Sequence, residues 1–315
     1  MRSRKRGANR HRVVADSEGP DAGAAFFGCH TRIGSGHPHY VGMRRVEHIA
    51  ILALAIASAN PVTASTVVQE IVQRSVQNAD ADWTAAPQYA FTERDVVTQH
   101  GKRTTKSYQV AMIEGSPYNQ LIAINDQPLS PAQTAYESVK LRQETDRRRK
   151  ETPGERQKRL EKYQAERRQD HALISEMVKA FDFSFRGQET VNGRRCFVLE
   201  AAPRASYQPR RRDTKVLLGM RGRIWIDTEQ YQWVKVHAEV FRPVTFGLFI
   251  AHVQPGTEFT LEQSPVQNNI WLPSHFATQV KATVLLFSKS SSDDETYTNY
   301  RSAESGGVKS DGTAH

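Results

Sequence analysis

The segment from Gly222 to Phe241 constrains the fold most, because it has the pattern of two β-strands joined by a short turn. Ile224 and Ile226 share one face of the first strand, and Trp225 lies on the other. After the turn at 228–230, an apolar row alternates with a mixed row of aromatic and charged residues. The apolar row is Val234, Val236, Ala238 and Val240. A lone hairpin is marginal in water, so we expect further strands and a covering helix.

The rest of the chain supplies both. Apolar residues at helical spacing predict an amphipathic helix over 66–77, followed by a polar link over 78–87. Alternating segments separated by turn residues predict an antiparallel meander. The expected strands are 89–98, 105–114, 118–125, 181–190, 194–201, 223–227, 231–241, 245–252, 258–265, 270–277, 280–287 and 295–301.

Two capping boxes interrupt the strands. Ser130-Pro-Ala-Gln133 and Thr152-Pro-Gly-Glu155 each place a hydroxyl before Pro and a Gln or Glu three residues on. They predict helices over 133–151 and 154–180. Residues 140–170 hold twelve Lys/Arg and seven Asp/Glu. A solvated helical arm is favoured over a nucleic-acid contact, because acidic residues are interleaved and stacking aromatics are few.

The first 64 residues resemble an export signal preceded by an extension. Residues 43–64 combine a basic start, an apolar run from Ile49 to Ala59 and a small-residue end, which predicts a cleaved signal peptide and a periplasmic or secreted protein. A single membrane anchor or a buried helix is the alternative. Residues 1–42 are then a disordered extension or a misplaced start, the domain spans 65–301, and 302–315 form a disordered tail.

Charge does not indicate nucleic acid as a partner. The net charge of +9 includes nine basic and four acidic residues within 1–64, so the remainder carries only +4 (34 basic less 30 acidic). The basic loop 204–212 is interpreted as solvated, with contact to anionic lipid or an acidic partner as the alternative.

No catalytic constellation is recognisable, so we expect no catalytic residue, metal or cofactor, and no enzyme activity. The sequence lacks a glycine-rich phosphate loop, metal-type Cys/His spacing and a nucleophile elbow. Cys196 lies in a strand pattern and is expected to be a small buried hydrophobe. Asp227 is expected to accept amide bonds from its own turn. His237 is expected to be exposed or hydrogen-bonded.

One segment is apolar on both faces. Phe246 to Ala251 reads Phe-Gly-Leu-Phe-Ile-Ala, whereas a half-buried strand should alternate. Either the strand is covered on both sides, which is favoured, or it forms part of an apolar cavity wall.

Three short motifs resemble the LolA/LolB/RseB superfamily of periplasmic lipoprotein-sorting and sensor proteins. They are Gly-Arg-Ile-Trp-Ile-Asp at 222–227, Gln-Trp-Val-Lys-Val at 232–236 and Ile-Trp-Leu-Pro at 270–273. The resemblance implies an α+β fold: a strongly curved antiparallel sheet, an incomplete β-barrel of about eleven strands, with helices packed on its open side. The long charged helical insertion at about 133–180 departs from the compact carriers.

The resemblance also implies an apolar cavity that binds a lipid or lipoprotein acyl chain without catalysis. The candidate cavity residues are Val234, Val236, Val240, Phe246, Leu248, Phe249, Met177 and Phe181. The alternative is a regulatory or scaffolding module that binds an envelope protein through the charged arm. Neither function implies nucleic acid or a stable membrane span.

Overall fold

The computed structural model describes residues 64–211, 213–246, 251–284 and 287–302. The helices are α1 (Ala64–Ala85), α2 (Pro131–Arg149) and α3 (Pro153–Ala180), with short 3-10 segments η1 (Ala86–Gln88), η2 (Asp213–Gly219) and η3 (Gln267–Asn269). The strands are β1 (Tyr89–Gln99), β2 (Lys102–Ile113), β3 (Ser116–Ile124), β4 (Gln127–Pro128), β5 (Phe181–Val191), β6 (Arg194–Pro203), β7 (Met220–Asp227), β8 (Trp233–Val240), β9 (Val244–Phe246), β10 (Ala251–Val253), β11 (Glu258–Pro265), β12 (Trp271–Val284) and β13 (Phe287–Ser302).

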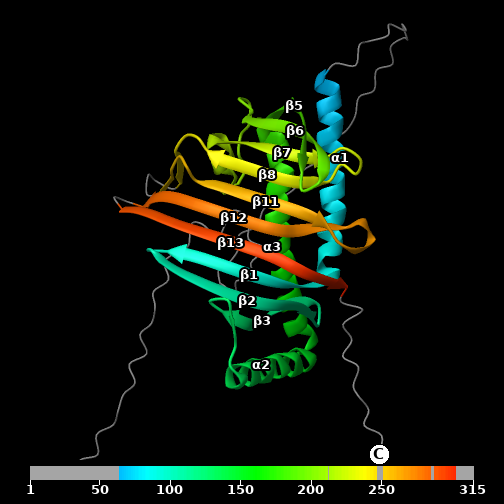
Figure 1. Cartoon of the computed structure of the whole chain (residues 1–315), viewed down its shortest axis with the longest axis vertical. Helices are drawn as coiled ribbons and strands as arrows, with labels where there is room; N and C mark the ends of the chain where they lie inside the picture. Colours follow the sequence, from blue (N-terminus) through cyan, green and yellow to red (C-terminus); the bar gives the residue numbers. More distant parts are fainter. Residues whose placement is uncertain (1–63, 212, 247–250, 285–286, 303–315) are drawn as a thin grey trace, which may run out of the picture.

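These strands form one open, curved antiparallel sheet, which confirms the expected α+β class (Figure 1). Within the described residues the sheet has thirteen strands, against the eleven or so that were expected. Its order is β4-β3-β2-β1-β13-β12-β11-β8-β7-β6-β5, with β9 and β10 attached beside β12. The expectation of a simple meander is therefore wrong at two points, one of which is the pairing of β8 with β11 past β9 and β10. The first strand pairs with the last, Tyr89 opposite Ser302, which joins the N-terminal three strands to the remainder.

Two strand predictions fail for opposite reasons. The expected strand 245–252 is instead two short strands, β9 and β10, that pair with each other. Conversely, one long strand, β12, occupies most of the two segments that were expected to form separate strands, 270–277 and 280–287. The segment between residues 277 and 280 contains no Gly, Pro or Asn, so nothing in it stops the strand.

Both capping boxes are confirmed, and the helices they begin lie against the sheet. Ser130 and Thr152 accept from the backbone amides of Gln133 and Glu155, whose side chains reach back. At 28 residues, α3 is about 42 Å long. It crosses the strands with α1 (Figure 1) and contacts β3 near one edge of the sheet and β5 at the other. α3 therefore braces the sheet from edge to edge and is not a freely solvated arm.

α1 is longer than its apolar repeat predicts, because polar side chains in its second half are anchored. The expected polar link 78–87 is mostly helical. Asn78 Nδ2 donates to the carbonyl of Gln230 at 2.7 Å, and Asp82 Oδ1 accepts from the amide of Trp271 at 3.0 Å. These bonds attach α1 to the β7–β8 turn and to the start of β12.

The main core lies between α1, the end of α3 and the face of the sheet that they cover. Ile224, Ile226, Val236 and Val240 belong to it, together with residues of α1 such as Ile71. Trp233 also lies in this core, whereas Val234 lies in a second cluster with Cys196 and Trp271. The expected alternation is thus wrong at these two positions. The cause is a register shift in the pairing of β7 with β8. Trp225 pairs with Lys235 and Ile226 pairs with Trp233, which leaves Val234 out of the register and exchanges the faces of Trp233 and Val234.

Three polar or reactive residues have the structural roles expected of them. Asp227 Oδ1 accepts from the amides of Glu229 and Gln230 at 3.0 and 2.7 Å, which closes the β7–β8 turn. His237 Nδ1 lies 3.1 Å from Thr260 Oγ1. Cys196 is fully buried, and burial raises the pKa of its thiol to about 11, so it is a thiol and not a thiolate at neutral pH.

The expected signal peptide, the extension before it and the polar tail after residue 302 lie outside the described residues. Within the part of the chain that is described, no helix has the length and apolar character needed to cross a bilayer.

Candidate functional site

A groove between α1, the last turns of α3 and β5 is the candidate site, and we call it the α1–α3 groove. It has a volume of about 640 Å³, within the range of roughly 300–1,000 Å³ typical of small-molecule sites. Its lining residues come from these three elements and from the loop after β6. They are Val68, Gln69, Val72, Gln73, Val76, Gln77, Ser175, Val178, Lys179, Asp182, Phe183 and Arg204.

The floor of the groove is apolar and its rim is polar. Val68, Val72 and Val76 form a row at i, i+4 and i+8 along α1, and Val178 and Phe183 face them. Val68 and Val72 are buried, whereas Val76, Val178 and Phe183 are half-buried. The rim consists of glutamines of α1 and charged residues of α3 and β5. Such a groove can bind an apolar chain along its floor and leave a polar head at the surface.

The charged residues at the rim are already paired. Lys179 Nζ lies 3.4 Å from Glu176 Oε2, and Arg204 Nε lies 2.8 Å from Asp182 Oδ1. Arg204 also donates from its backbone amide to the carbonyl of Ala180 at 2.7 Å, which fixes the junction between α3 and β5. With one acid for each base, the groove offers no net charge to select a charged head group.

Of the residues proposed from the sequence, those whose side chains the structure describes are not among the residues that line the groove. Met177, Phe181, Val236 and Val240 are buried in the main core. Val234 lies in the second cluster, as described above. Phe246 ends β9, and Leu248 and Phe249 lie outside the described residues. The valine row of α1 was visible in the sequence as the stripe of an amphipathic helix, but nothing in the sequence indicated that one side of the stripe remains open.

The same face of the sheet becomes polar toward β1 and β13. Glu93 and Glu295 are both buried, and Glu295 accepts from the hydroxyl of Tyr297. Glu93 is paired with Tyr297 across the two strands, so these side chains share the face that bears the main core. The two carboxylates thus interrupt an apolar face to which Phe91, Phe276 and Tyr297 also contribute.

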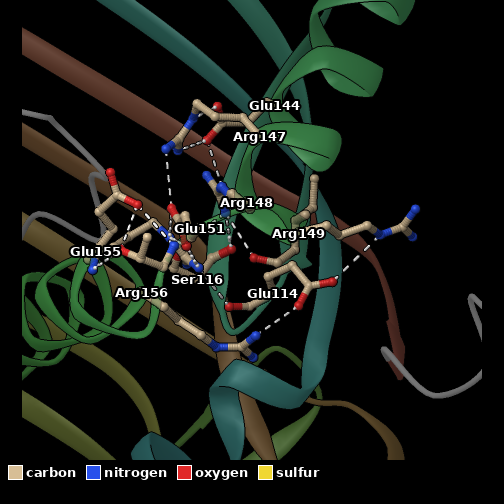
Figure 2. Close-up of polar contacts among 12 residues, drawn as sticks. Glu114, Ser116, Glu144, Arg147, Arg148, Arg149, Glu151, Glu155 and Arg156 are labelled. Atoms are coloured by element: carbon tan, nitrogen blue, oxygen red, sulfur yellow. Dashed lines mark hydrogen bonds and ion pairs between the residues drawn. The ribbon is translucent and has the colours of Figure 1, made fainter.

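The junction between α2 and α3 holds a network of arginines and glutamates, shown in Figure 2. Arg148 is buried and donates to the carbonyls of Ile113, Ser116 and Pro117 at 2.8–3.1 Å and to Glu144 at 2.6 Å. These carbonyls belong to the β2–β3 hairpin near the edge of the sheet.

A second arginine, on α3, strengthens this junction. Arg159 binds Ser116 Oγ at 2.7 Å, the carbonyl of Glu114 at 3.1 Å and Glu151 at 2.6 Å. Hydrogen bonds from Arg147 and Arg148 lower the pKa of Glu144 to about 2, so it is ionised throughout the physiological range. The network is saturated with internal partners and serves to fasten the helical arm to the sheet edge.

Asp82 makes the attachment of α1 sensitive to pH. Burial raises the pKa of its carboxyl from 3.8 to about 6, against the lowering effect of the bond from Trp271. Between about pH 4 and 6, the Asp82 carboxyl is protonated in the folded state and ionised in the unfolded chain. This protonation stabilises the folded state at low pH, and the stabilisation is lost as pH rises through 6.

Replacing Asp82 by Asn is expected to raise the free energy of unfolding at pH 8 by about 1–3 kcal/mol, because the amide never ionises and still offers an acceptor to Trp271. At pH 4 the gain should fall to about 0.5 kcal/mol, since Asp82 is then protonated in the folded state and only about half ionised in the unfolded chain. Urea denaturation of both proteins at the two pH values measures this. A gain that is equal at pH 4 and pH 8 would contradict the titration of Asp82.

Among the residues that the structure describes, no group of His, Cys, Asp and Glu side chains is arranged to hold a metal ion.

Comparison with known proteins gives matches at the level of fold. No family model matches the sequence, and no curated protein matches it. Among solved structures, a putative outer membrane lipoprotein-sorting protein domain from Vibrio parahaemolyticus is similar over 73% of this chain and 93% of its own, with 10% identity and a TM-score of 0.30. A LolA superfamily protein from Nitrosomonas europaea is similar over 74% and 92%, with 8% identity and a TM-score of 0.28.

The MucA/MucB complex of Pseudomonas aeruginosa also contains a similar chain, over 74% of this chain and 99% of that one, with 10% identity and a TM-score of 0.22. The sequence motifs indicated a remote resemblance to the LolA/LolB/RseB superfamily, and LolA-superfamily and lipoprotein-sorting proteins recur among these solved structures. At these identities the similarity concerns the fold alone.

Proposed function

We propose that the protein is a non-enzymatic envelope carrier that binds an acyl chain in the α1–α3 groove. The observation that supports this most is the groove itself, with its valine and phenylalanine floor and a rim whose charges are internally paired. Burial of hydrocarbon on such a floor supplies up to about 0.8 kcal/mol for each methylene removed from water. The export signal expected at residues 43–64 would deliver the protein to the periplasm, where lipoproteins and lipids are cargo.

The absence of enzymatic activity is part of the proposal. Within the described residues, the titratable side chains nearest the groove floor, Lys179, Asp182 and Arg204, are engaged with rim partners. None of them is paired with a nucleophile in the arrangement that catalysis requires.

A chain-length series tests the proposal. Saturated fatty acids of increasing length are titrated against the purified protein in competition with a fluorescent fatty acid. Affinity is expected to rise by up to about fourfold for each added methylene until the groove is filled, and then to level off. Because the rim is neutral, a free acid and its methyl ester should differ by less than about threefold. No binding at any length, or affinity that depends only on the charge of the head group, would refute the proposal.

A second candidate function is binding of an envelope protein through α2, and two exposed side chains favour it. Tyr136 is 64% exposed and Val139 is also exposed, one turn apart on the outer side of α2. Changing both to Ser should abolish partner capture from an envelope extract and leave fatty-acid binding unchanged. Deletion of the whole arm would be uninformative, because α3 braces the sheet.

A further inference from the structure

The two edges of the sheet differ in how they are covered. At the β3 edge, the short strand β4 pairs with one end, and the buried guanidinium of Arg148 binds three carbonyls around the β2–β3 turn at the other. At the opposite edge, no strand within the described residues pairs with the outer side of β5 (Figure 1). An uncovered edge strand can pair with a strand of another chain, so the outer side of β5 is a candidate interface.

One face of β5 carries three phenylalanines in a row. Phe181, Phe183 and Phe185 alternate with polar residues, and they lie on the side of the sheet that bears the main core. Phe181 is buried and Phe183 is half-buried. Phe185 is 47% exposed, with its ring edge-on to Phe197 of β6. The row therefore leads from the core out to solvent along an edge strand.

The other face of β5 carries an acid and a base on either side of Ser184. Asp182 Oδ1 lies 2.8 Å from Arg204 Nε. Arg186 pairs with Glu200, which lies opposite Ser184 on this face. All four charged side chains are partly exposed, so each can still meet a charge on another molecule.

We propose that β5 pairs antiparallel with β5 of a second copy of this chain, about a two-fold axis at Ser184. In this register, Asp182 of each copy lies opposite Arg186 of the other. On the core side of the sheet, Phe183 lies opposite Phe185, so both faces are complementary. Moving the axis by one residue in either direction would place Asp182 or Arg186 opposite Ser184 and lose both ion pairs. Charge complementarity therefore selects the axis at Ser184.

The remaining charged and polar groups at this edge permit that register. Glu189, beyond the register shift in β5, accepts a hydrogen bond from Trp225 at 2.7 Å. Its counterpart lies before the second copy's β5, near Lys179, so it opposes no acid. The carbonyl of Phe181 accepts from Arg204 at 3.0 Å, so the pairing begins one residue later. The contact goes beyond acyl-chain binding, because it forms between protein chains and needs no ligand.

Sedimentation velocity of the full chain over a series of concentrations tests the inference. The wild type is expected to form a dimer as its concentration rises. Asp182→Arg and Arg186→Asp should each weaken dimerisation at least about tenfold, because each opposes like charges twice. An equimolar mixture of these two variants should form a dimer again, since the mixed pairing restores both ion pairs. Arg221→Asp, in an exposed ion pair on β7, is the matched control and should dimerise as wild type.

Cysteine cross-linking tests the position of the axis. In a Cys29→Ser background, Ser184→Cys should form a disulfide between two copies, because the axis places the two thiols opposite each other. Thr190→Cys, also exposed on β5, should not cross-link, since it lies far from the axis. Cys196 is buried in both proteins, so it does not compete.

A chain that stays monomeric at every concentration would overturn the inference, as would a dimer that the charge variants leave unchanged. A mixture of the two charge variants that stays monomeric would also overturn it, as would cross-linking through Thr190→Cys in place of Ser184→Cys. Dimerisation is measured without fatty acid, and the groove variant Val76→Trp should dimerise as wild type. The two proposals can therefore fail separately.

Discussion

Replacing Arg148 by Ala is expected to lower the free energy of unfolding by about 3 kcal/mol, because it removes a buried cation that satisfies several groups at once. The carbonyls of Ile113, Ser116 and Pro117 would lose their shared donor, and Glu144 would lose one of its two arginines. Urea denaturation followed by circular dichroism measures the change. The β2–β3 edge would also be freed for pairing with another chain, so we expect the variant to aggregate more readily.

The neighbouring Arg149 provides a matched control. Its side chain is 65% exposed, and its ion pair with Glu114 is 3.7 Å long. Arg149→Ala should change the free energy of unfolding by less than about 0.5 kcal/mol. Equal effects at the two positions would contradict the assignment of Arg148 as the fastener of the helical arm.

Filling the α1–α3 groove should have the largest effect on binding. Val76→Trp combined with Val178→Trp places two indoles on facing sides of the groove floor, at positions that are only half-buried. We expect the affinity for a long-chain fatty acid to fall at least about tenfold, which corresponds to about 1.4 kcal/mol. Competition with a fluorescent fatty acid measures the affinity.

Val139→Trp on the exposed side of α2 is the control for adding an indole. It should bind fatty acid as the wild type does. Thermal denaturation establishes that the double variant is folded before its affinity is compared. Unchanged affinity in a folded double variant would exclude the groove as the binding site.

Local chemistry predicted much of this fold. The Ser130 and Thr152 capping boxes placed the two helix starts within two residues of those observed. Asn192 and Gly193 both have positive φ, as the tight turn between β5 and β6 requires. The prediction that Asp227 accepts hydrogen bonds from the amides of its own turn is confirmed. In each case the signal lies within a few residues of the feature it determines, so no knowledge of distant contacts is needed.

Features that depend on distant contacts were not predictable in this way. The exchange of Trp233 and Val234 between faces comes from a bulge against β7. The pairing of β1 with β13 joins residues more than 190 positions apart, such as Thr98 and Ser292. The polar half of α1 remains helical because Asn78 and Asp82 bind the sheet. The groove is open because the α1 valine row is only partly covered, which no pattern within α1 reveals.

Photo-cross-linking with a diazirine-bearing long-chain fatty acid tests the central claim most directly. The full chain is irradiated with the probe, digested and mapped by mass spectrometry, with and without excess unlabelled fatty acid. The account predicts competable cross-links on the groove walls, in α1 between Val68 and Gln77 and in the segment from Ser175 to Phe183. Competable cross-links confined to other surfaces, or no competable cross-link at all, would contradict it.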